Sequence, residues 1–332
     1  MKAGIVGLGA VGAATAMAIA LRAQIQELVL VNRNRARAKG VATDMRYGMP
    51  ISALTRIEDG DYGDLAGAGV VVIAAGVNEK AGGATDRTDP AGRLRLLEPN
   101  VRVFEEIVPR IVGAAPEAVI LVATDPPEPL VDAARICAGH ERVFGTGTYL
   151  DSLRFRVHLA ERLQVSPKDV DAYVVGEHGT SSVFLWSSAR IGGERVIDIL
   201  SRRGIEFDQF RQTIERDVRY ANITIIEGIG ASQYGIGMVT ARMVEAVLRD
   251  ERAVMPVGSY SERYSVTLSL PSVVGRAGVA ETLWPEMSND EENALRQSIE
   301  ILQKAVSKYV IRPPGMTAPD LIQAVQRCAV SK

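Results

Sequence analysis

Residues 4–20 read "GIVGLGAVGAATAMAIA", and the order of apolar residues, glycines and alanines in them predicts the fold of the first half of the chain. A short apolar run leads into Gly7, Gly9 and Gly12, and an Ala-rich helical segment follows. In such a unit the first glycine permits a tight turn, the second lets the backbone approach a pyrophosphate, and the third lets the helix pack closely. The helix N-terminus then faces the anion. We predict a dinucleotide-binding loop; a glycine-rich turn chosen only for packing is the alternative.

The rest of the first half predicts a parallel sheet. Short apolar runs alternate with longer helical stretches, which is typical of parallel strands covered on both faces. The expected strands are Gly4–Val6, Leu28–Val31, Val70–Ala74 and Val119–Ala123.

The pattern changes after about residue 145. Strands are expected there at Val170–Val175 and Ser265–Ser269, and long helices near Gln209–Glu227, Tyr234–Leu248 and Asp290–Val306. We therefore predict an α/β fold: a dinucleotide-binding domain with a Rossmann-type doubly wound parallel sheet at residues 1–145, followed by an α+β substrate domain at residues 146–332.

Composition narrows the class of protein. The 332 residues are 47% hydrophobic and 23% charged, as in soluble globular proteins, and the net charge of −2 implies no general attraction to nucleic acid or to a membrane. The two cysteines, Cys137 and Cys328, form neither a metal-ligand spacing nor a disulfide framework. Because the N-terminus also lacks the pattern of a signal peptide, we expect a cytoplasmic enzyme without a metal.

The end of the second expected strand bears on the choice of cofactor. An acidic residue there would accept from the ribose hydroxyls of NAD, but "LVLVNRNRARAKG" at 28–40 has Asn32 at that place, followed by Arg33. Asparagine does not repel a 2′-phosphate, and arginine can pair with one through two hydrogen bonds. We expect NAD or NADP, with Arg33 either at the phosphate or in solvent. Arg35 and Arg37 are expected on a solvated helix face.

Two further stretches place charged groups where chemistry could use them. "TYLDSLRFR" at 148–156 puts Asp151 and Arg154 three residues apart, on one face of a helix. The arginine fork matches a carboxylate, although a local helix ion pair is the simpler reading. "GRLRLLEPN" at 92–100 puts Arg93 between a Gly- and Pro-containing loop and an apolar helix, a suitable place for an arginine on a mobile lid.

Together these stretches resemble the lactate/malate dehydrogenase family over nearly the whole chain. The matching segments are "GLGAVG" at 7–12, "AAG" at 74–76, "RLRLLEPNVRVFEEIVPRI" at 93–111, "GTGTYLDSLRFR" at 145–156, "GEHGTSS" at 176–182, "GASQYGIGMVTAR" at 230–242 and "LSLPSVVGRAGV" at 268–279.

The resemblance assigns roles to these residues. It implies that His178 of "GEHG" accepts and donates the proton, that Asp151 orients its ring, and that Arg154 binds the substrate carboxylate. Arg93 would close over the substrate and polarise the carbonyl. Imidazole suits proton transfer near neutral pH.

The resemblance also implies contacts for other residues. Gly76 and Asp125 would lie against the cofactor, and Ser232 beside the substrate. His140 and His158 match no role in the family.

Three positions depart from the family pattern. Asp125 stands where the family usually has asparagine, and a carboxylate there would repel a substrate anion. Glu79, in a loop longer than that of common lactate dehydrogenases, occupies the place that reads the far end of the substrate, and it would repel a second carboxylate. Arg87, in the same loop, could instead bind that carboxylate.

We therefore expect an NAD(P)-dependent L-2-hydroxy-acid dehydrogenase acting on lactate/pyruvate or a bulkier monocarboxylic homologue. A malate dehydrogenase that uses Arg87 is the first alternative. A nucleotide-binding protein without turnover is the second, motivated by Asp125. The family resemblance implies a homodimer or homotetramer.

Overall fold

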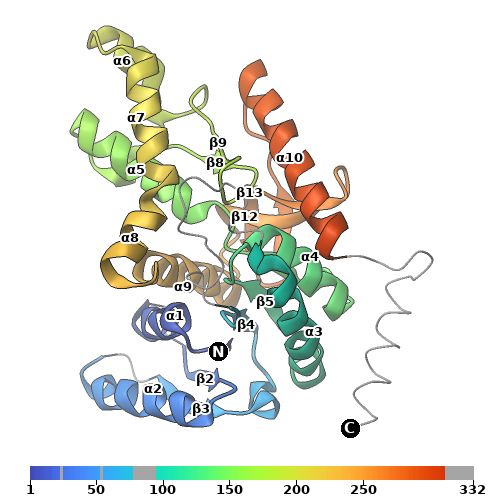
Figure 1. Ribbon diagram of the computed structural model, residues 1–332. Coiled ribbons are helices and arrows are strands. Elements are labelled where there is room, and N and C mark those ends of the chain that lie inside the picture. Colours follow the sequence, from blue (N-terminus) through green and yellow to red (C-terminus); the bar gives the residue numbers. More distant parts are fainter. Residues whose placement is uncertain (23–24, 53–54, 78–94, 311–332) are drawn as a thin grey trace.

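The computed structural model describes residues 1–22, 25–52, 55–77 and 95–310. In these ranges the main sheet has nine strands in the order β14-β13-β12-β6-β5-β4-β1-β2-β3 (Figure 1). The first-half strands, all parallel, are β1 (Lys2–Val6), β2 (Glu27–Val31), β3 (Arg56–Gly60), β4 (Val70–Ile73), β5 (Val119–Val122) and β6 (Val143–Gly145). Their order, 3-2-1-4-5-6, is that of a doubly wound dinucleotide-binding sheet, which confirms the predicted fold.

The same sheet continues into the second half of the chain. Antiparallel strands β12 (Ala253–Ser261), β13 (Val266–Gly275) and β14 (Gly278–Thr282) extend it beyond β6. The contact between β12 and β6 pairs Gly258 with Gly145. Strands distant in sequence are therefore fixed to the first-half sheet, whereas the division of the chain at residue 145 stays a prediction.

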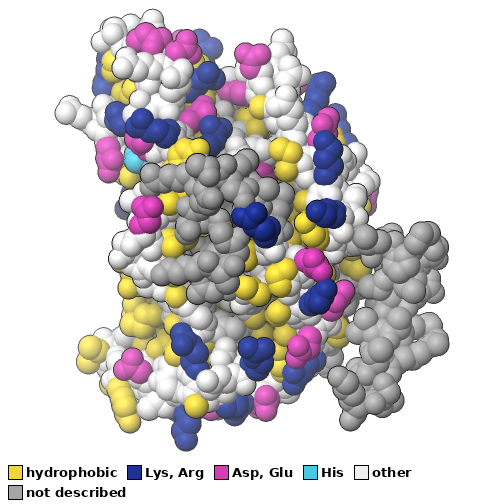
Figure 2. Space-filling view, in the orientation of Figure 1, with side chains coloured by type: hydrophobic (Ala, Val, Ile, Leu, Met, Phe, Trp, Pro, Cys, Tyr) yellow, Lys and Arg dark blue, Asp and Glu magenta, His cyan; other side chains and the backbone are white. Residues whose placement is uncertain are grey.

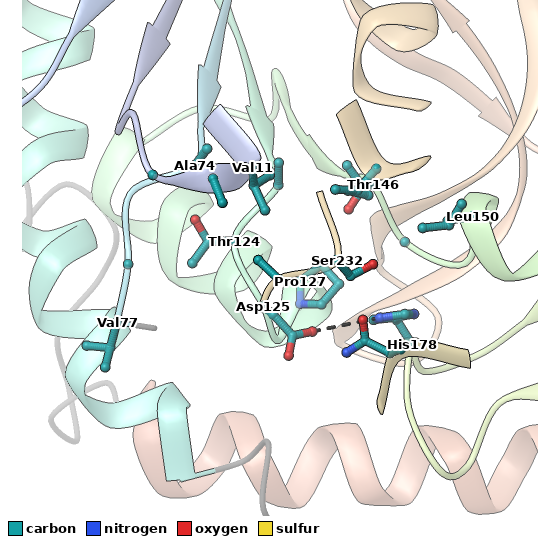
Figure 3. A pocket seen from close by; sticks show the side chains of 18 of the residues that line it. Val11, Ala74, Val77, Thr124, Asp125, Pro127, Thr146, Leu150, His178 and Ser232 are labelled. Carbon is teal, nitrogen blue, oxygen red and sulfur yellow. Dashed lines mark ion pairs between the residues drawn. The ribbon is translucent and has the colours of Figure 1, made fainter. Parts of the chain in front are cut away.

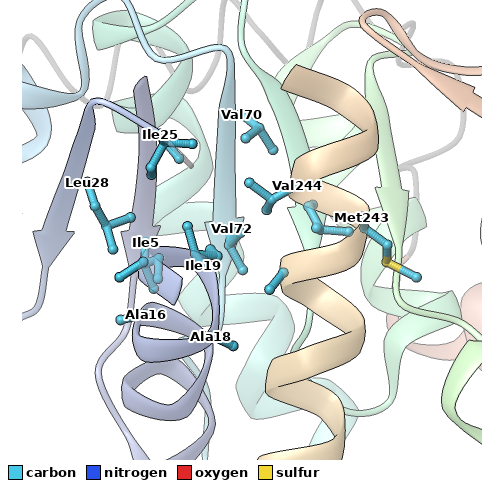
Figure 4. Close-up of a cluster of buried hydrophobic side chains, with 14 of the residues drawn as sticks. Ile5, Ala16, Ala18, Ile19, Ile25, Leu28, Val70, Val72, Met243 and Val244 are labelled. Atoms are coloured by element: carbon cyan, nitrogen blue, oxygen red, sulfur yellow. The ribbon is translucent and has the colours of Figure 1, made fainter. Parts of the chain in front are cut away.

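Helices cover both faces of the parallel sheet because its strands are apolar on both sides. In β4, Val70 and Val72 pack in the cluster formed with α1 (Ala10–Arg22), α2 (Arg35–Gly48) and α9 (Tyr234–Arg249). Figure 4 shows part of this cluster, with α9 lying beside α1. Val71 and Ile73 pack instead against α3 (Leu97–Ala114) and α4 (Pro127–Ala138). Such continuous burial is what the uninterrupted apolar runs indicated.

The remaining elements stand beside the sheet. They are helices α5 (Tyr149–Leu163), α6 (Val196–Arg202), α7 (Phe207–Arg219), α8 (Ala221–Ile229) and α10 (Asn289–Tyr309), and short strands β7 (Val170–Asp171), β8 (Val174–Val175), β9 (Val183–Phe184), β10 (Arg190–Ile191) and β11 (Glu194–Arg195). A capping box starts α10: Ser288 accepts from the backbone of Glu291, whose side chain accepts from the backbone of Ser288. No helix in the described ranges has the length and hydrophobicity needed to cross a bilayer.

Three expected elements were wrong in extent. The strand expected at Ser265–Ser269 continues to Gly275 as β13. The run Val170–Val175 forms two strands, because β7 pairs with β10 and β8 pairs with β9. Between them the carbonyl of Ala172 accepts from Arg156 and that of Tyr173 from the backbone of Leu185, so no single ladder runs through. The expected helix Gln209–Glu227 breaks at Tyr220, which ends α7 and precedes α8.

Candidate active site

The glycine loop joins β1 to α1 with the geometry expected of a phosphate-binding turn. Gly7 has a φ of +99°, and a Cβ on Gly12 would lie 1.9 Å from the Gly7 oxygen. Neither position accepts a side chain. Gly9 differs, because a Cβ there would meet no atom within 4 Å, and Gly9 lines a cleft between the glycine loop and the segment of His178. The N-terminus of α1 thus opens toward free space, which fits a pyrophosphate.

The end of β2 supports this loop. The Asn32 side chain accepts from the backbone N–H of Leu8 at 3.0 Å and donates to the Asn34 carbonyl at 3.1 Å. Arg37 donates to the Leu8 carbonyl. Asn32 and Arg37 therefore both hold the glycine loop in place, in addition to any contact with the cofactor.

The other two arginines after β2 differ from each other. Arg35 pairs with Asp59 and Asp61, at 3.6 Å each, and half of its side chain stays exposed, in keeping with the solvated helix face expected there. Arg33 is exposed, next to Asn32. Of the arginines in this segment, it is the one whose guanidinium the structure leaves available for a phosphate, as far as the described residues go.

The catalytic residues predicted from the sequence are brought together by α5 and the segment after β8. Asp151 Oδ2 lies 2.5 Å from His178 Nδ1, and Asp151 Oδ1 lies 3.1 Å from an Arg154 guanidinium nitrogen. Their side chains are 9%, 18% and 12% exposed, in the order Asp151, His178, Arg154. Asp151 therefore fixes the ring with Nδ1 protonated, which leaves Nε2 to exchange a proton. The ion pair between Asp151 and Arg154 on α5 is therefore also part of the arrangement around His178.

Asp125 lies on the other side of the imidazole, after β5. Its carboxylate is 3.9 Å from His178 Nε2 (Figure 3). The side chain of Asn100, fully buried in α3, donates to the Asp125 carbonyl at 2.9 Å and accepts from the Val77 N–H at 2.7 Å. Asn100 thus ties the segment after β4 to the segment after β5. Sequence reasoning missed it, although one asparagine in an apolar helix is a usable signal.

A second missed residue is Glu128, in the first turn of α4. It is fully buried, and its Oε1 accepts from the His178 backbone N–H at 3.1 Å and from the Ser269 hydroxyl at 2.7 Å. Burial raises the pKa of Glu128 to about 7. The sequence signal that could have identified Glu128 is an acidic residue between two prolines at the start of an apolar run.

The cleft gathers the remaining predicted residues. Gly76, Asp125, Arg154, His178 and Ser232 line it together with Gly9, and buried Asn222 of α8 contributes to the same wall. In Figure 3, Ser232 and His178 lie close to Asp125, whereas Val11 and Thr124 lie further from His178, toward the glycine loop.

Some predicted residues are not among the lining side chains. Glu79, Arg87 and Arg93 lie outside the described residues. Neither His140 nor His158 lines this cleft, in keeping with their lack of a predicted role.

One cleft therefore combines a pyrophosphate-binding helix terminus, a guanidinium suited to a carboxylate, and an imidazole oriented for proton transfer. A nicotinamide dinucleotide would fit this donor set, with its phosphates held at Gly9 and the N-terminus of α1. These features define a nicotinamide-dependent dehydrogenase of hydroxy acids.

Comparison with known proteins identifies the family. The NAD-binding domain of lactate/malate dehydrogenases matches residues 1–145, and their α/β C-terminal domain matches residues 148–311. The chain belongs to the lactate/malate dehydrogenase family, and it is an NAD-dependent dehydrogenase that acts on the CH–OH group of 2-hydroxy acids.

Individual relatives agree with this family. The chain is 44% identical to the L-lactate dehydrogenase of Deinococcus radiodurans over 91% of this chain and 97% of that protein. It is also 44% identical to the L-lactate dehydrogenase of Thermus aquaticus, over 92% and 99%. Among solved structures, a minor L-lactate dehydrogenase from Enterococcus mundtii superposes with a TM-score of 0.85 at 31% identity, covering 92% of this chain and 98% of that one.

Proposed function

We propose that this chain interconverts pyruvate and L-lactate with NADH and NAD. The observation that carries the proposal is the arrangement of Arg154, Asp151 and His178 in the same cleft as the Gly9 loop. The names of the relatives support the substrate, since L-lactate dehydrogenases cover nearly the whole chain at 38–44% identity.

The proposed mechanism assigns one task to each described side chain. Arg154 binds the C1 carboxylate of the keto acid through parallel hydrogen bonds. The imidazolium of His178 donates the Nε2 proton to the carbonyl oxygen during reduction, and the neutral ring takes a proton from the hydroxyl during oxidation. Asp151 stabilises the imidazolium and holds its orientation. A bound nicotinamide supplies the hydride chemistry, which no side chain provides.

The roles proposed for Arg93 and Glu79 rest on the sequence alone, because both residues lie outside the described ranges. Arg93 is proposed to polarise the carbonyl and exclude water when its segment closes. Glu79 is proposed to disfavour a second carboxylate, so that monocarboxylic acids are preferred. The comparisons do not favour the malate alternative. The binding of a second carboxylate by Arg87 belongs to that alternative and is not part of this proposal.

NADP is proposed as a second, usable cofactor. Asn32 brings no negative charge to the ribose, and exposed Arg33 lies next to it. The Asn32 carbonyl oxygen already accepts from Leu8, so its contact with the ribose would come in addition to holding the loop.

A homodimer or homotetramer is proposed as the working form. Tyr47 and Ile51 near the end of α2, and Tyr234 and Met238 on α9, expose between 52% and 95% of their surface. Figure 2 shows hydrophobic side chains at the lower left of the molecule, where Figure 1 places α1 and α2. A cytoplasmic location is proposed on cysteine usage.

The activity is tested by measuring NADH oxidation with pyruvate and NAD reduction with L-lactate and D-lactate. Turnover of pyruvate and of L-lactate, but not of D-lactate, is expected. Binding of NADH without turnover of any 2-keto acid would support instead the nucleotide-binding protein without activity.

A further inference from the structure

Glu128 connects the two segments that carry the catalytic side chains. Its Oε1 accepts from the backbone N–H of His178 and from the hydroxyl of Ser269. The Ser269 Oγ in turn accepts from the backbone N–H of Thr148 at 3.1 Å, in the residue that precedes α5. One buried carboxyl thus reaches the His178 segment directly and the start of the helix bearing Asp151 through a single hydroxyl.

The hydrogen bonds suit the ionised form of Glu128. Both partners of Oε1 donate, and the buried Oε2 has no hydrogen-bond partner on the described part of the chain, so no acceptor awaits a proton there. On the other side, Gly258 of β12 faces the Glu128 side chain and contributes no charge. A buried carboxylate without a cation of its own is costly, which makes the charge of a neighbour important.

That neighbour is His178. Burial raises the pKa of Glu128 to about 7, and the charge of His178 is the largest influence that lowers it. The attraction is mutual, so ionised Glu128 favours the imidazolium. Asp151 and Asp125 act on the ring in the same sense, at 2.5 and 3.9 Å, and the charge of Arg154, which pairs with Asp151, opposes them.

We propose that Glu128 is a positioning residue whose buried charge, with that of Asp151, sets the pH range in which His178 carries its proton. It acts through His178 and does not touch the substrate. The inference concerns the proton relay of the proposed reaction and so rests on that proposed function.

Glu128→Gln is the main variant, because the amide oxygen can still accept from His178 and Ser269 while the charge is lost. Asp132→Asn is the matched control. Asp132 lies one turn further along α4, is also buried, and accepts from the backbone and hydroxyl of Thr267 on the same strand as Ser269. Its hydrogen bonds within the described residues go to Thr267 and not to the His178 segment, so it reports the structural cost of losing a buried acid.

The direct readout is the NMR titration of ¹⁵N-labelled histidine, with His178→Asn used to assign the His178 signal. Glu128→Gln should lower the midpoint of His178 by about one pH unit, a tenfold change in its protonation equilibrium. Asp132→Asn should leave it unchanged, and Glu128→Asp, which keeps the charge, should stay near wild type. An equal midpoint in wild type and Glu128→Gln would overturn the proposal.

The pH dependence of the steady-state rates gives a second readout, and the direction of its shift is predicted. In Glu128→Gln the pH at which pyruvate reduction declines, and the pH at which L-lactate oxidation rises, should both move down. Near pH 7, reduction therefore slows while oxidation gains. A parallel loss in both directions, with no shift along the pH axis, would show a merely structural role and contradict the proposal.

Wild-type protein offers a test that needs no Glu128 variant. The ¹³C carboxyl signal of Glu128 should titrate near pH 7, and His178→Asn should raise its midpoint because a favourable charge is lost. An unmoved midpoint would contradict the coupling. Because these titrations need no turnover, a failure of the proposed lactate activity would be seen separately in the assay above.

Discussion

The carboxylate of Asp125 lies 3.9 Å from Nε2 of His178, while Asp151 meets Nδ1 of the same ring at 2.5 Å. The imidazole therefore stands between two acids. Asp151 is the partner that the proposed proton transfer requires, whereas Asp125 lines the cleft in which the keto acid is proposed to bind. The charge at Asp125 favours the imidazolium and disfavours the anionic substrate at the same time.

Asp125→Asn separates these two effects. At about pH 6, where imidazole is ordinarily protonated, the KM for pyruvate should fall about tenfold, equivalent to about 1.4 kcal/mol, because repulsion of the substrate carboxylate is removed. Steady-state kinetics with saturating NADH measure this. An unchanged or raised KM would mean that the Asp125 charge does not oppose substrate binding.

His178→Asn should abolish most turnover and leave cofactor binding nearly unchanged. The expected loss in kcat is about 10²–10⁴-fold, the range typical of a lost general acid–base, because the imidazole that exchanges the proton is removed. NADH fluorescence titration provides the control for binding. A loss below about tenfold would remove His178 from the proton relay.

Arg154→Lys should weaken keto-acid binding while the pair with Asp151 persists. A point charge cannot reproduce two parallel hydrogen bonds to a carboxylate, so the KM for pyruvate should rise about 10–100-fold, as for the loss of one charge-assisted bond. The measurement is KM together with kcat. If KM stayed at the wild-type value, Arg154 would be only a helix ion pair.

The cofactor proposal predicts usable activity with NADPH and a slight preference for it over NADH. Asn32→Asp should shift the preference toward NADH, since a carboxylate repels the 2′-phosphate yet can still accept from the Leu8 N–H. Arg33→Ala should lower efficiency with NADPH more than with NADH. Titration of both cofactors with all three proteins decides it; strong selectivity of the wild type for NADH would show that Arg33 serves no phosphate.

Local sequence predicted those parts of the site that depend on neighbouring residues. The turn at Gly7, the packing at Gly12 and the pair Asp151–Arg154 each follow from spacing within a few residues. The partnership of His178 with Asp151 spans 27 residues, and only the family resemblance suggested it.

Contacts over longer distances escaped prediction. Glu128 meets Ser269 across 141 residues, and Asn100 meets Asp125 across 25, because the fold packs β13 against α4 and α3 against α4. The break of Val170–Val175 has the same origin: partners supplied by Arg156 and Leu185 decide where a strand ends. A polar residue in an apolar segment predicts that such a hydrogen bond exists, but it does not identify the partner.

The most direct test of the proposed lactate dehydrogenase activity compares kcat/KM for pyruvate, 2-ketoisocaproate and oxaloacetate, with NADH, in wild type and in Arg87→Ala. We expect the monocarboxylic acids to be preferred, with pyruvate the best substrate and Arg87→Ala close to wild type, because Glu79 is proposed to repel a second carboxylate. If oxaloacetate were the best wild-type substrate and lost its advantage in Arg87→Ala, the proposed function would be contradicted and the chain would be a malate dehydrogenase.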